Sequence, residues 1–261
     1  MAKIKKWVGD IFLEPIEHKY HHRVTGKIYK SVTTTLASIE PHFDAESVAL
    51  AIVNQLDNVK QERYIGMSQQ QILDYWEYLN EQANIYGTKV HDIVERYLLA
   101  DKWYFPKDDE EGKFEQKVID GYNSLNIDEG IAMWPERILF SEQYELAGTS
   151  DLIIDVDSVF FDVADYKTNR VFNFYNPYGY QTLLKPFEHL QACQWSIYSL
   201  QLSVYAYMYE LEFPKRKCRQ IYVLYWDKEK ETFQKIQIMY LKKEAKQLIE
   251  MHHYNIIKNN G

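Results

Sequence analysis

The stretch that most constrains the fold is residues 145–170, which predicts a β-hairpin with charged side chains on both strands. Residues 152–154 and 159–161 are runs of β-branched and aromatic residues, and the turn-forming residues 155–158 separate them. Apolar runs on either side of a polar turn are typical of paired antiparallel strands. We therefore expect two strands joined by a turn near Asp157.

This hairpin brings two aspartates and a lysine together. With the turn near Asp157, Asp151 lies almost opposite Asp165, and Asp165 and Lys167 share a face because alternate side chains of a strand point the same way. Hard cations such as Mg²⁺ prefer carboxylate oxygens, and a neighbouring ammonium group could orient or deprotonate a water on the same metal. On these residues alone, a metal site and a cross-strand salt bridge are equally good interpretations.

The composition favours one domain over residues 1–261. The chain is 46% hydrophobic, has few prolines and glycines, and contains no internal repeat, so that a single core can form. We expect an N-terminal hairpin and helices in residues 1–66 and the main core in residues 67–261. An aromatic, aperiodic loop or lid is expected near residues 171–188.

Partners and compartment are constrained by the same composition. No apolar run is long enough to cross a bilayer and no signal peptide is evident, which predicts a cytoplasmic protein without a membrane partner. Two cysteines, Cys193 and Cys218, fit a reducing compartment and are too few for a disulfide framework or an all-cysteine iron–sulfur site. The net charge of −8 argues against nonspecific adhesion to nucleic acid.

The N-terminal part of the chain contains a candidate phosphate contact. Residues 12–31 predict a small hairpin, and a helix is expected to begin after it with a hydroxyl as its N-cap. Ser31 and Thr33 stand at this helix start, where exposed backbone amides can bind a phosphate. Ordinary capping explains the same residues.

A histidine stands in the following helical region. Residues 68–71 have capping-box spacing and open an amphipathic helix, which Gly87 and Thr88 are expected to interrupt or bend. His91 then falls in the first turn of the next segment, one turn before Glu95. Alone, such a histidine fits a surface or hydrogen-bonded core position as well as a metal ligand.

The remaining elements alternate between sheet and helix. We expect a helix over residues 114–125, a strand over residues 134–140 with Glu136 at its start, a long helix over 189–211, a hairpin over 219–240 and a last helix over 242–257. In the long helix, two Gln-x-x-x-Tyr pairs each share a helix face. They are Gln194 with Tyr198 and Gln201 with Tyr205.

Five motifs follow one another in a fixed order within residues 70–210. They are Gly-Thr-x-x-His in a helix, Glu in a strand, Gly-Thr-Ser-Asp and Asp-Tyr-Lys-Thr in the hairpin, and Gln-x-x-x-Tyr in a helix. This order resembles the PD-(D/E)xK nuclease superfamily, specifically its RecB-like exonuclease branch. The Ser-Val-Thr-Thr segment is similar to the N-terminal part of phage nucleases and of the mitochondrial genome maintenance exonuclease group. The resemblance implies an α/β fold with a central mixed β-sheet flanked by helices, a restriction-endonuclease-like core with an N-terminal helical elaboration.

The resemblance also implies roles for the site residues. Asp151 would be the first metal-binding aspartate, Asp165 the acidic residue of the D-x-K element and Lys167 the catalytic lysine. His91 would complete the metal shell, together with a backbone carbonyl near Tyr166. Mg²⁺ or Mn²⁺ is the implied cofactor, and no iron–sulfur cluster is expected because the cysteines of such relatives are missing.

Two assignments within the motifs have rivals. The resemblance favours Gln201 and Tyr205 as the substrate-holding pair, because the helix of the family usually runs into an apolar Tyr-Ala stretch, which here begins at Tyr205. Gln194 with Tyr198 is the competing match.

Glu136 is the best candidate for the glutamate of the preceding strand, with Glu142 and Glu95 as rivals. Ser150 stands before Asp151, where the name of the superfamily has a proline.

The implied activity is metal-dependent DNA hydrolysis, with an exonuclease acting on single-stranded or frayed ends preferred. The aromatic loop over residues 172–180 could stack unpaired bases, or it could form a hydrophobic plug over the sheet. An endonuclease of the same fold and a noncatalytic nucleic-acid-binding protein are the alternatives. DNA is the expected partner, with proteins of replication, recombination or repair as further candidates, in a bacterium or a phage-infected host.

Overall fold

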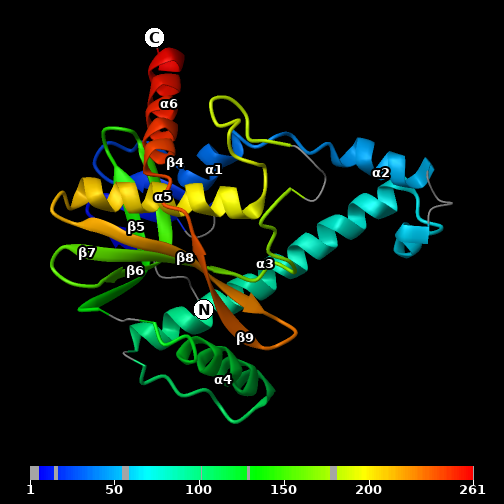
Figure 1. Cartoon of the computed structure of the whole chain (residues 1–261), viewed down its shortest axis with the longest axis horizontal. Helices are drawn as coiled ribbons and strands as arrows, with labels where there is room; N and C mark the ends of the chain where they lie inside the picture. The colour runs from blue at the N-terminus through cyan, green and yellow to red at the C-terminus, as the bar shows by residue number, and fades with distance from the viewer. Residues whose placement is uncertain are drawn as a thin grey trace.

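The computed structural model describes residues 6–14, 17–54, 59–100, 102–127, 130–176 and 181–260. Within these ranges nine strands form one mixed sheet in the order β1-β2-β3-β4-β6-β7-β8-β9, with β5 paired to β6 off this path. Helices flank the sheet (Figure 1). The predicted α/β class with a central mixed sheet is confirmed.

The main part of the sheet is built from a three-stranded antiparallel meander, a hairpin and the crossover between them. Its strands are β5 (Ala132–Ser141), β6 (Leu146–Asp155), β7 (Phe160–Lys167), β8 (Lys217–Asp227) and β9 (Thr232–Ile238). Strands β6 and β7 are antiparallel, as are β8 and β9, whereas β7 and β8 run parallel. A parallel pair needs a long crossover, which here contains helix α5 (Gln194–Glu212).

The β6–β7 hairpin has the predicted register. Leu152 pairs with Ala164, so that the next positions on the two strands are Asp151 and Asp165. In the turn, the Asp157 carboxylate accepts hydrogen bonds from the backbone amides of residues 159 and 160, each at 2.7 Å. The alternation of side chains and this turn together fix which residues of the hairpin share a face.

The N-terminal strands extend the same sheet. They are β1 (Lys6–Val8), β2 (Ile11–Glu14), β3 (Lys19–His22) and β4 (Ile28–Ser31). Each is antiparallel to the next, and β4 then joins β6 in parallel. The predicted hairpin is confirmed as β3 and β4. Helix α1 (Val32–Ala37) follows directly.

Two helical layers cover the two faces of the sheet. Helices α5 and α6 (Lys242–Asn260) pack on the face that includes Ile153 and Val163. The C-terminal part of α3 (Gln69–Leu99) and α4 (Glu110–Asn123) pack on the face that includes Leu152 and Ala164. Because side chains alternate along β7, Asp165 and Lys167 follow Val163 on the α5 side.

The expected interruption at Gly87 is wrong, because α3 runs through it as one helix of 31 residues, about 46 Å long. A Cβ at Gly87 would lie 2.9 Å from the Thr168 Oγ1 atom, at the end of β7. The glycine therefore lets α3 approach the hairpin closely. The capping box at Ser68 is confirmed.

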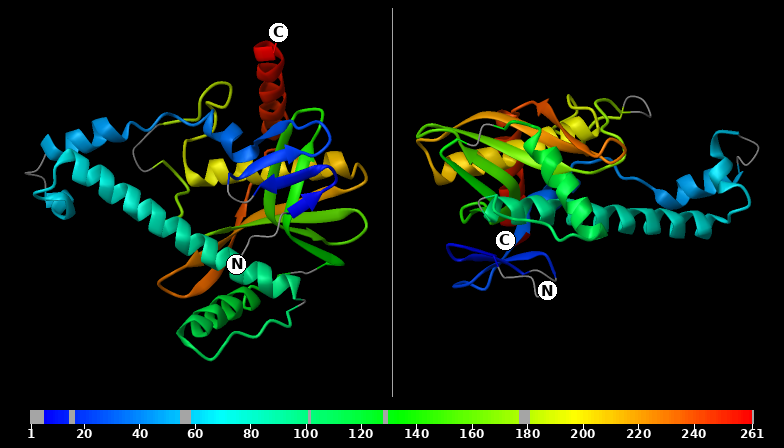
Figure 2. Two further views of the ribbon diagram at one scale, coloured as in Figure 1. Left: turned by 180° about the vertical axis from the view of Figure 1, so that it is seen from behind. Right: turned by 90° about the horizontal axis from the view of Figure 1, so that it is seen from below.

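A helical arm projects from the side of the sheet (Figures 1 and 2). It consists of α2 (Ala45–Asn54), the 3-10 helix η1 (Val59–Tyr64) and the N-terminal half of α3. The arm has a small core of its own, formed by Ala49, Ile52, Tyr64 and Ile72. None of the described helices is both long enough and apolar enough to span a membrane.

The segment before α5 differs in one respect from the prediction. Helix α5 begins at Gln194 and not at residue 189, since the residues before it form turns and a short bridge between Thr182 and Gln191. The irregular loop predicted near residues 171–188 is confirmed for residues 171–176 and 181–188. Residues 177–180 lie outside the described part of the chain.

Candidate metal centre

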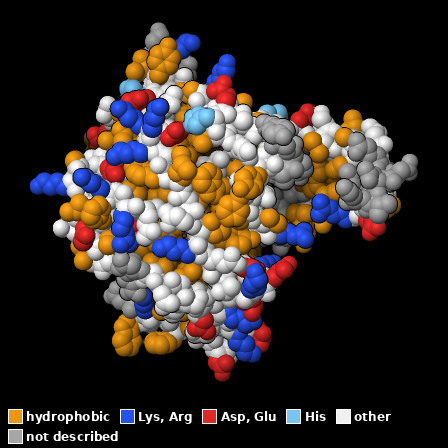
Figure 3. Space-filling model, in the orientation of Figure 1, with side chains coloured by type: hydrophobic (Ala, Val, Ile, Leu, Met, Phe, Trp, Pro, Cys, Tyr) orange, Lys and Arg blue, Asp and Glu red, His pale blue; other side chains and the backbone are white. Residues whose placement is uncertain are grey.

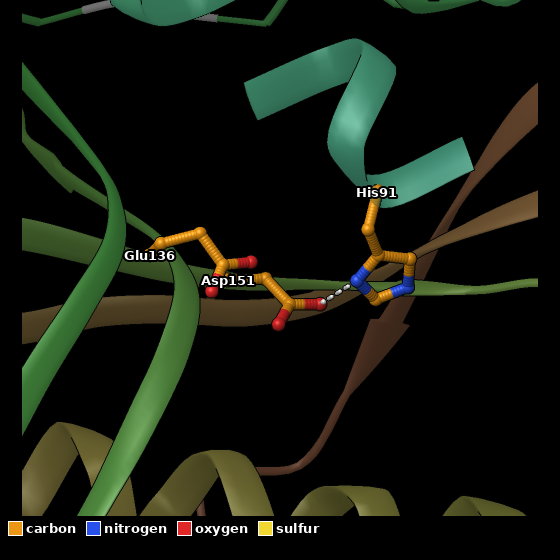
Figure 4. Close-up of side chains that lie close together, drawn as sticks. All are labelled: His91, Glu136 and Asp151. Carbon is orange, nitrogen blue, oxygen red and sulfur yellow. Dashed lines mark ion pairs between the residues drawn. The ribbon is translucent and has the colours of Figure 1, made fainter. Parts of the chain in front are cut away.

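Three possible metal ligands converge from three different elements. His91 on α3, Glu136 on β5 and Asp151 on β6 each offer one ligand atom within 4.8 Å of the other two. Figure 4 shows the three side chains turned toward one another. The Nδ1 atom of His91 is 3.4 Å from the Oδ2 atom of Asp151. One imidazole nitrogen and two carboxylate oxygens are a donor set consistent with a divalent cation such as Mn²⁺ or Mg²⁺.

The backbone of Glu136 is in a left-handed conformation, with φ of 50°. Its neighbours pair regularly across the ladder, Pro135 with Leu152 and Arg137 with Ser150, so that Glu136 stands opposite Asp151 at the irregular position between them. A non-glycine residue in this conformation is strained, and such strain often marks functional positions. This kink brings the Glu136 carboxylate to the other two ligands.

The strain predicts an unusual order of stabilities at this position. Glu136→Gly is expected to be more stable than Glu136→Ala by about 1 kcal/mol, because the left-handed conformation costs a non-glycine residue about 1–2 kcal/mol and the freedom of glycine in the unfolded chain offsets part of the gain. Urea unfolding in EDTA measures the difference. Glu142 is the control, because its φ is not positive, and there the alanine variant should be more stable than the glycine variant. If the glycine variant were the more stable one at both positions, or the alanine variant at both, the prediction would be wrong.

Of the three candidate glutamates, only Glu136 belongs to this group among the described residues. The side chain of Glu142 is 68% exposed and lies 3.9 Å from the Nε2 atom of His22. Glu95 lies one helical turn beyond His91 on α3 and is not a member of the group. The geometry thus favours Glu136 over its two rivals.

Asp151 is held in place by the neighbouring strand. Its Oδ2 atom accepts a hydrogen bond of 2.8 Å from the backbone amide of Tyr166. The Tyr166 ring points to the side of the sheet that α3 and α4 cover. There it contacts the His91 ring edge-on, with the ring centroids 5.5 Å apart. Tyr166 therefore positions two of the three possible ligands.

His91 has the protonation state that metal binding requires. Burial lowers its pKa most strongly, and Lys167 lowers it further. The carboxylates of Asp165 and Glu136 and a hydrogen bond to the Tyr166 backbone act in the opposite direction without restoring the ordinary value. The imidazole is therefore neutral at neutral pH, with a lone pair for a metal ion.

Asp165 and Lys167 form an ion pair beside this centre. The Asp165 side chain is 3% exposed. Among the described residues, it is not a member of the group formed by His91, Glu136 and Asp151. Burial lowers the pKa of Lys167, but Asp165 and Asp151 raise it more, so that the pKa lies above its usual range. Lys167 is thus an ammonium group and a hydrogen-bond donor.

The two Gln-x-x-x-Tyr pairs of α5 have different surroundings. The Tyr198 ring lies 4.8 Å from the Lys167 Nζ atom, and the Gln194 Oε1 atom accepts a 2.7 Å hydrogen bond from the Asn173 amide. Gln201 and Tyr205 are buried and 3.4 Å apart through their Nε2 and hydroxyl atoms. Tyr198 thus contacts Lys167, and the choice of Gln201 and Tyr205 as the substrate-holding pair stays a prediction.

Ser31 is the N-cap of α1, as predicted. Its hydroxyl accepts a hydrogen bond of 3.0 Å from the Thr34 amide and lies 3.0 Å from the Thr33 hydroxyl. Strand β4 places Ser31 next to Ala147, four residues before Asp151 on β6. These contacts are those of ordinary capping, and a role for Ser31 and Thr33 in substrate binding stays a prediction.

Comparisons with known proteins add little to this geometry. No family model matches the chain, and no curated protein matches it. Among solved structures, it is similar to the crystal structure of a "putative exonuclease" from Eubacterium rectale, with 12% sequence identity and a TM-score of 0.39 over 88% of this chain and 80% of that chain. A TM-score of this size is too low to assign a fold or an activity.

Proposed function

We propose that this protein is a nuclease that hydrolyses DNA with Mg²⁺ or Mn²⁺, most naturally an exonuclease on single-stranded or frayed ends. The observation that carries the proposal is the convergence of His91, Glu136 and Asp151 beside the ion pair of Asp165 and Lys167. A salt-bridged hairpin would need neither a neutral histidine from α3 nor a strained glutamate from β5. A hydrolytic metal site needs such ligands and a nearby cation.

The donor set fits a hard divalent cation because it combines carboxylate oxygens with one imidazole. His91, Glu136 and Asp151 would hold the ion, and Asp165 and the Tyr166 carbonyl are the further predicted ligands. A bound cation would neutralise the scissile phosphate and lower the pKa of a coordinated water.

Lys167 completes the proposed chemistry. As an ammonium group, it donates hydrogen bonds to the attacking water or to the phosphate oxygens on which negative charge develops. Asp165 on the same strand and the Tyr198 ring hold the ammonium in place. The role proposed for Lys167 is therefore orientation and charge stabilisation, not proton abstraction.

Nuclease assays on matched DNA substrates test this function. The wild-type protein is incubated with end-labelled single strands, blunt duplexes and closed circles, each in Mn²⁺, Mg²⁺ or EDTA. Metal-dependent release of nucleotides from free ends supports the exonuclease, and cutting of closed circles supports the endonuclease instead. DNA binding without hydrolysis in either metal would contradict an enzymatic function.

A further inference from the structure

Aromatic rings form a row that leads away from the candidate metal centre. The row begins at Tyr198, whose ring lies 4.8 Å from the Lys167 Nζ atom. Phe172 follows with its centroid 5.8 Å from that of Tyr198, and Phe174 follows 4.9 Å from Phe172. Tyr225 flanks the row, 6.1 Å from Phe172. The row thus connects the predicted phosphate-binding lysine to the loop before α5.

The outer end of the row is open to solvent. Phe174 is 49% exposed, and the next residue, Tyr175, is 75% exposed. Figure 3 shows hydrophobic side chains gathered on this face, over the N-terminal half of α5. Large aromatic side chains bury much apolar area when a partner covers them, so an exposed group beside a candidate active centre indicates a binding surface.

The loop that carries these rings is held to its neighbours. The Asn173 amide donates to the Gln194 side chain at 2.7 Å, and the Asn173 carbonyl accepts from the Trp195 amide at 3.1 Å. On the other side, the Tyr225 hydroxyl donates to the Arg170 carbonyl at 3.1 Å. The rings are therefore positioned before any ligand arrives, which reduces the entropy lost on binding.

The chemistry around the row favours nucleic acid over an apolar protein partner. A phosphate at Lys167 would lie next to Tyr198, the first ring of the row. The exposed Arg170 adds a cation on the segment between Lys167 and Phe172. Aromatic rings beside cations that track a backbone are the usual construction of single-strand sites. In a duplex the faces of the bases are already stacked and cannot meet a protein ring.

We propose that Phe174 and Tyr175 stack on unpaired bases of a DNA strand whose phosphate lies at Lys167. The row would then select single strands and frayed ends over intact duplex. This inference rests on the proposed function, because it takes Lys167 as the group that meets the scissile phosphate. It adds the residues that would recognise an unpaired strand.

Binding measurements without metal test the inference. Fluorescence anisotropy compares an end-labelled single strand with an abasic strand of the same length, which keeps the phosphates and lacks the bases. Phe174→Ala combined with Tyr175→Ala is expected to weaken binding of the normal strand at least about 5-fold, since one stacked base contributes about 1–3 kcal/mol. Binding of the abasic strand should be unchanged, and Tyr175→Phe should retain wild-type affinity.

A second pair of exposed rings gives the matched control. Trp103 and Phe105 are 77% and 76% exposed and lie on the loop between α3 and α4, so replacing both by alanine should leave DNA binding unchanged. Equal losses on normal and abasic strands, or no loss, would overturn the stacking inference. Calorimetry with Mn²⁺ tests the proposed function separately. If the wild-type protein binds no Mn²⁺, the proposed function is wrong, whether or not Phe174 and Tyr175 contribute to DNA binding.

Discussion

Lys167→Ala is expected to lose about 10²- to 10³-fold in the rate of DNA hydrolysis, which corresponds to about 2.7–4 kcal/mol of transition-state stabilisation. The ammonium group of Lys167 is fixed by Asp165 and the Tyr198 ring, and nearby carboxylates raise its pKa. Alanine removes the donor without removing His91 or Asp151. Single-turnover cleavage of an end-labelled strand measures the loss, and Mn²⁺ calorimetry should still detect the metal site.

The control for Lys167 is another lysine that forms an ion pair. Lys242 pairs with Glu210 between α6 and α5, and Lys242→Ala should keep full activity. Full activity of Lys167→Ala together with normal Mn²⁺ binding would contradict the assignment of the lysine. A loss of Mn²⁺ binding in Lys167→Ala would instead mean that the substitution disturbs the ligands.

The central hairpin could be predicted because residues close together in the sequence determine it. Side chains alternate with a period of two, and a turn at Asp157 then fixes that Asp151 stands opposite Asp165. Contacts between residues far apart in the sequence could not be predicted in this way. The sequence alone predicts that Gly87 interrupts a helix. In the structure, the missing side chain of Gly87 allows α3 to lie close to Thr168.

Other features have no local signal at all. The left-handed backbone of Glu136 depends on its place within β5, opposite Asp151 on β6. Cys193, the N-cap of α5, makes no side-chain capping hydrogen bond, so nothing in the sequence marks where α5 begins. The two Gln-x-x-x-Tyr pairs are seven residues apart and occupy nearly the same helix face, and only the sheet beneath decides that Tyr198 meets Lys167.

Asp151→Asn is expected to weaken Mn²⁺ binding by more than about 100-fold, since even the loss of an outer hydrogen-bond partner of a ligand costs about 10- to 100-fold. Hydrolysis should fall with it. The amide has the same shape and its oxygen can still accept the hydrogen bond from Tyr166. It also removes one of the charges that crowd Glu136 and Asp165. Stability in EDTA should therefore be unchanged or higher, as urea unfolding would show.

Asp162, on the same hairpin, provides the contrasting variant. It is 1% exposed and accepts hydrogen bonds from Arg219 at 2.9 and 2.6 Å and from Gln220 at 2.8 Å. Asp162→Asn weakens the charge-assisted hydrogen bonds from the exposed Arg219 and should cost about 1–3 kcal/mol of stability, with Mn²⁺ binding intact. The responses differ because the Asp162 carboxylate accepts hydrogen bonds directly from the Arg219 guanidinium. The Asp151 carboxylate instead lies beside the Glu136 carboxylate and the neutral His91 imidazole, while the Lys167 ammonium is hydrogen-bonded to Asp165. If Asp151→Asn destabilised the metal-free protein as Asp162→Asn does, Asp151 would be a structural residue and the metal centre would be wrong.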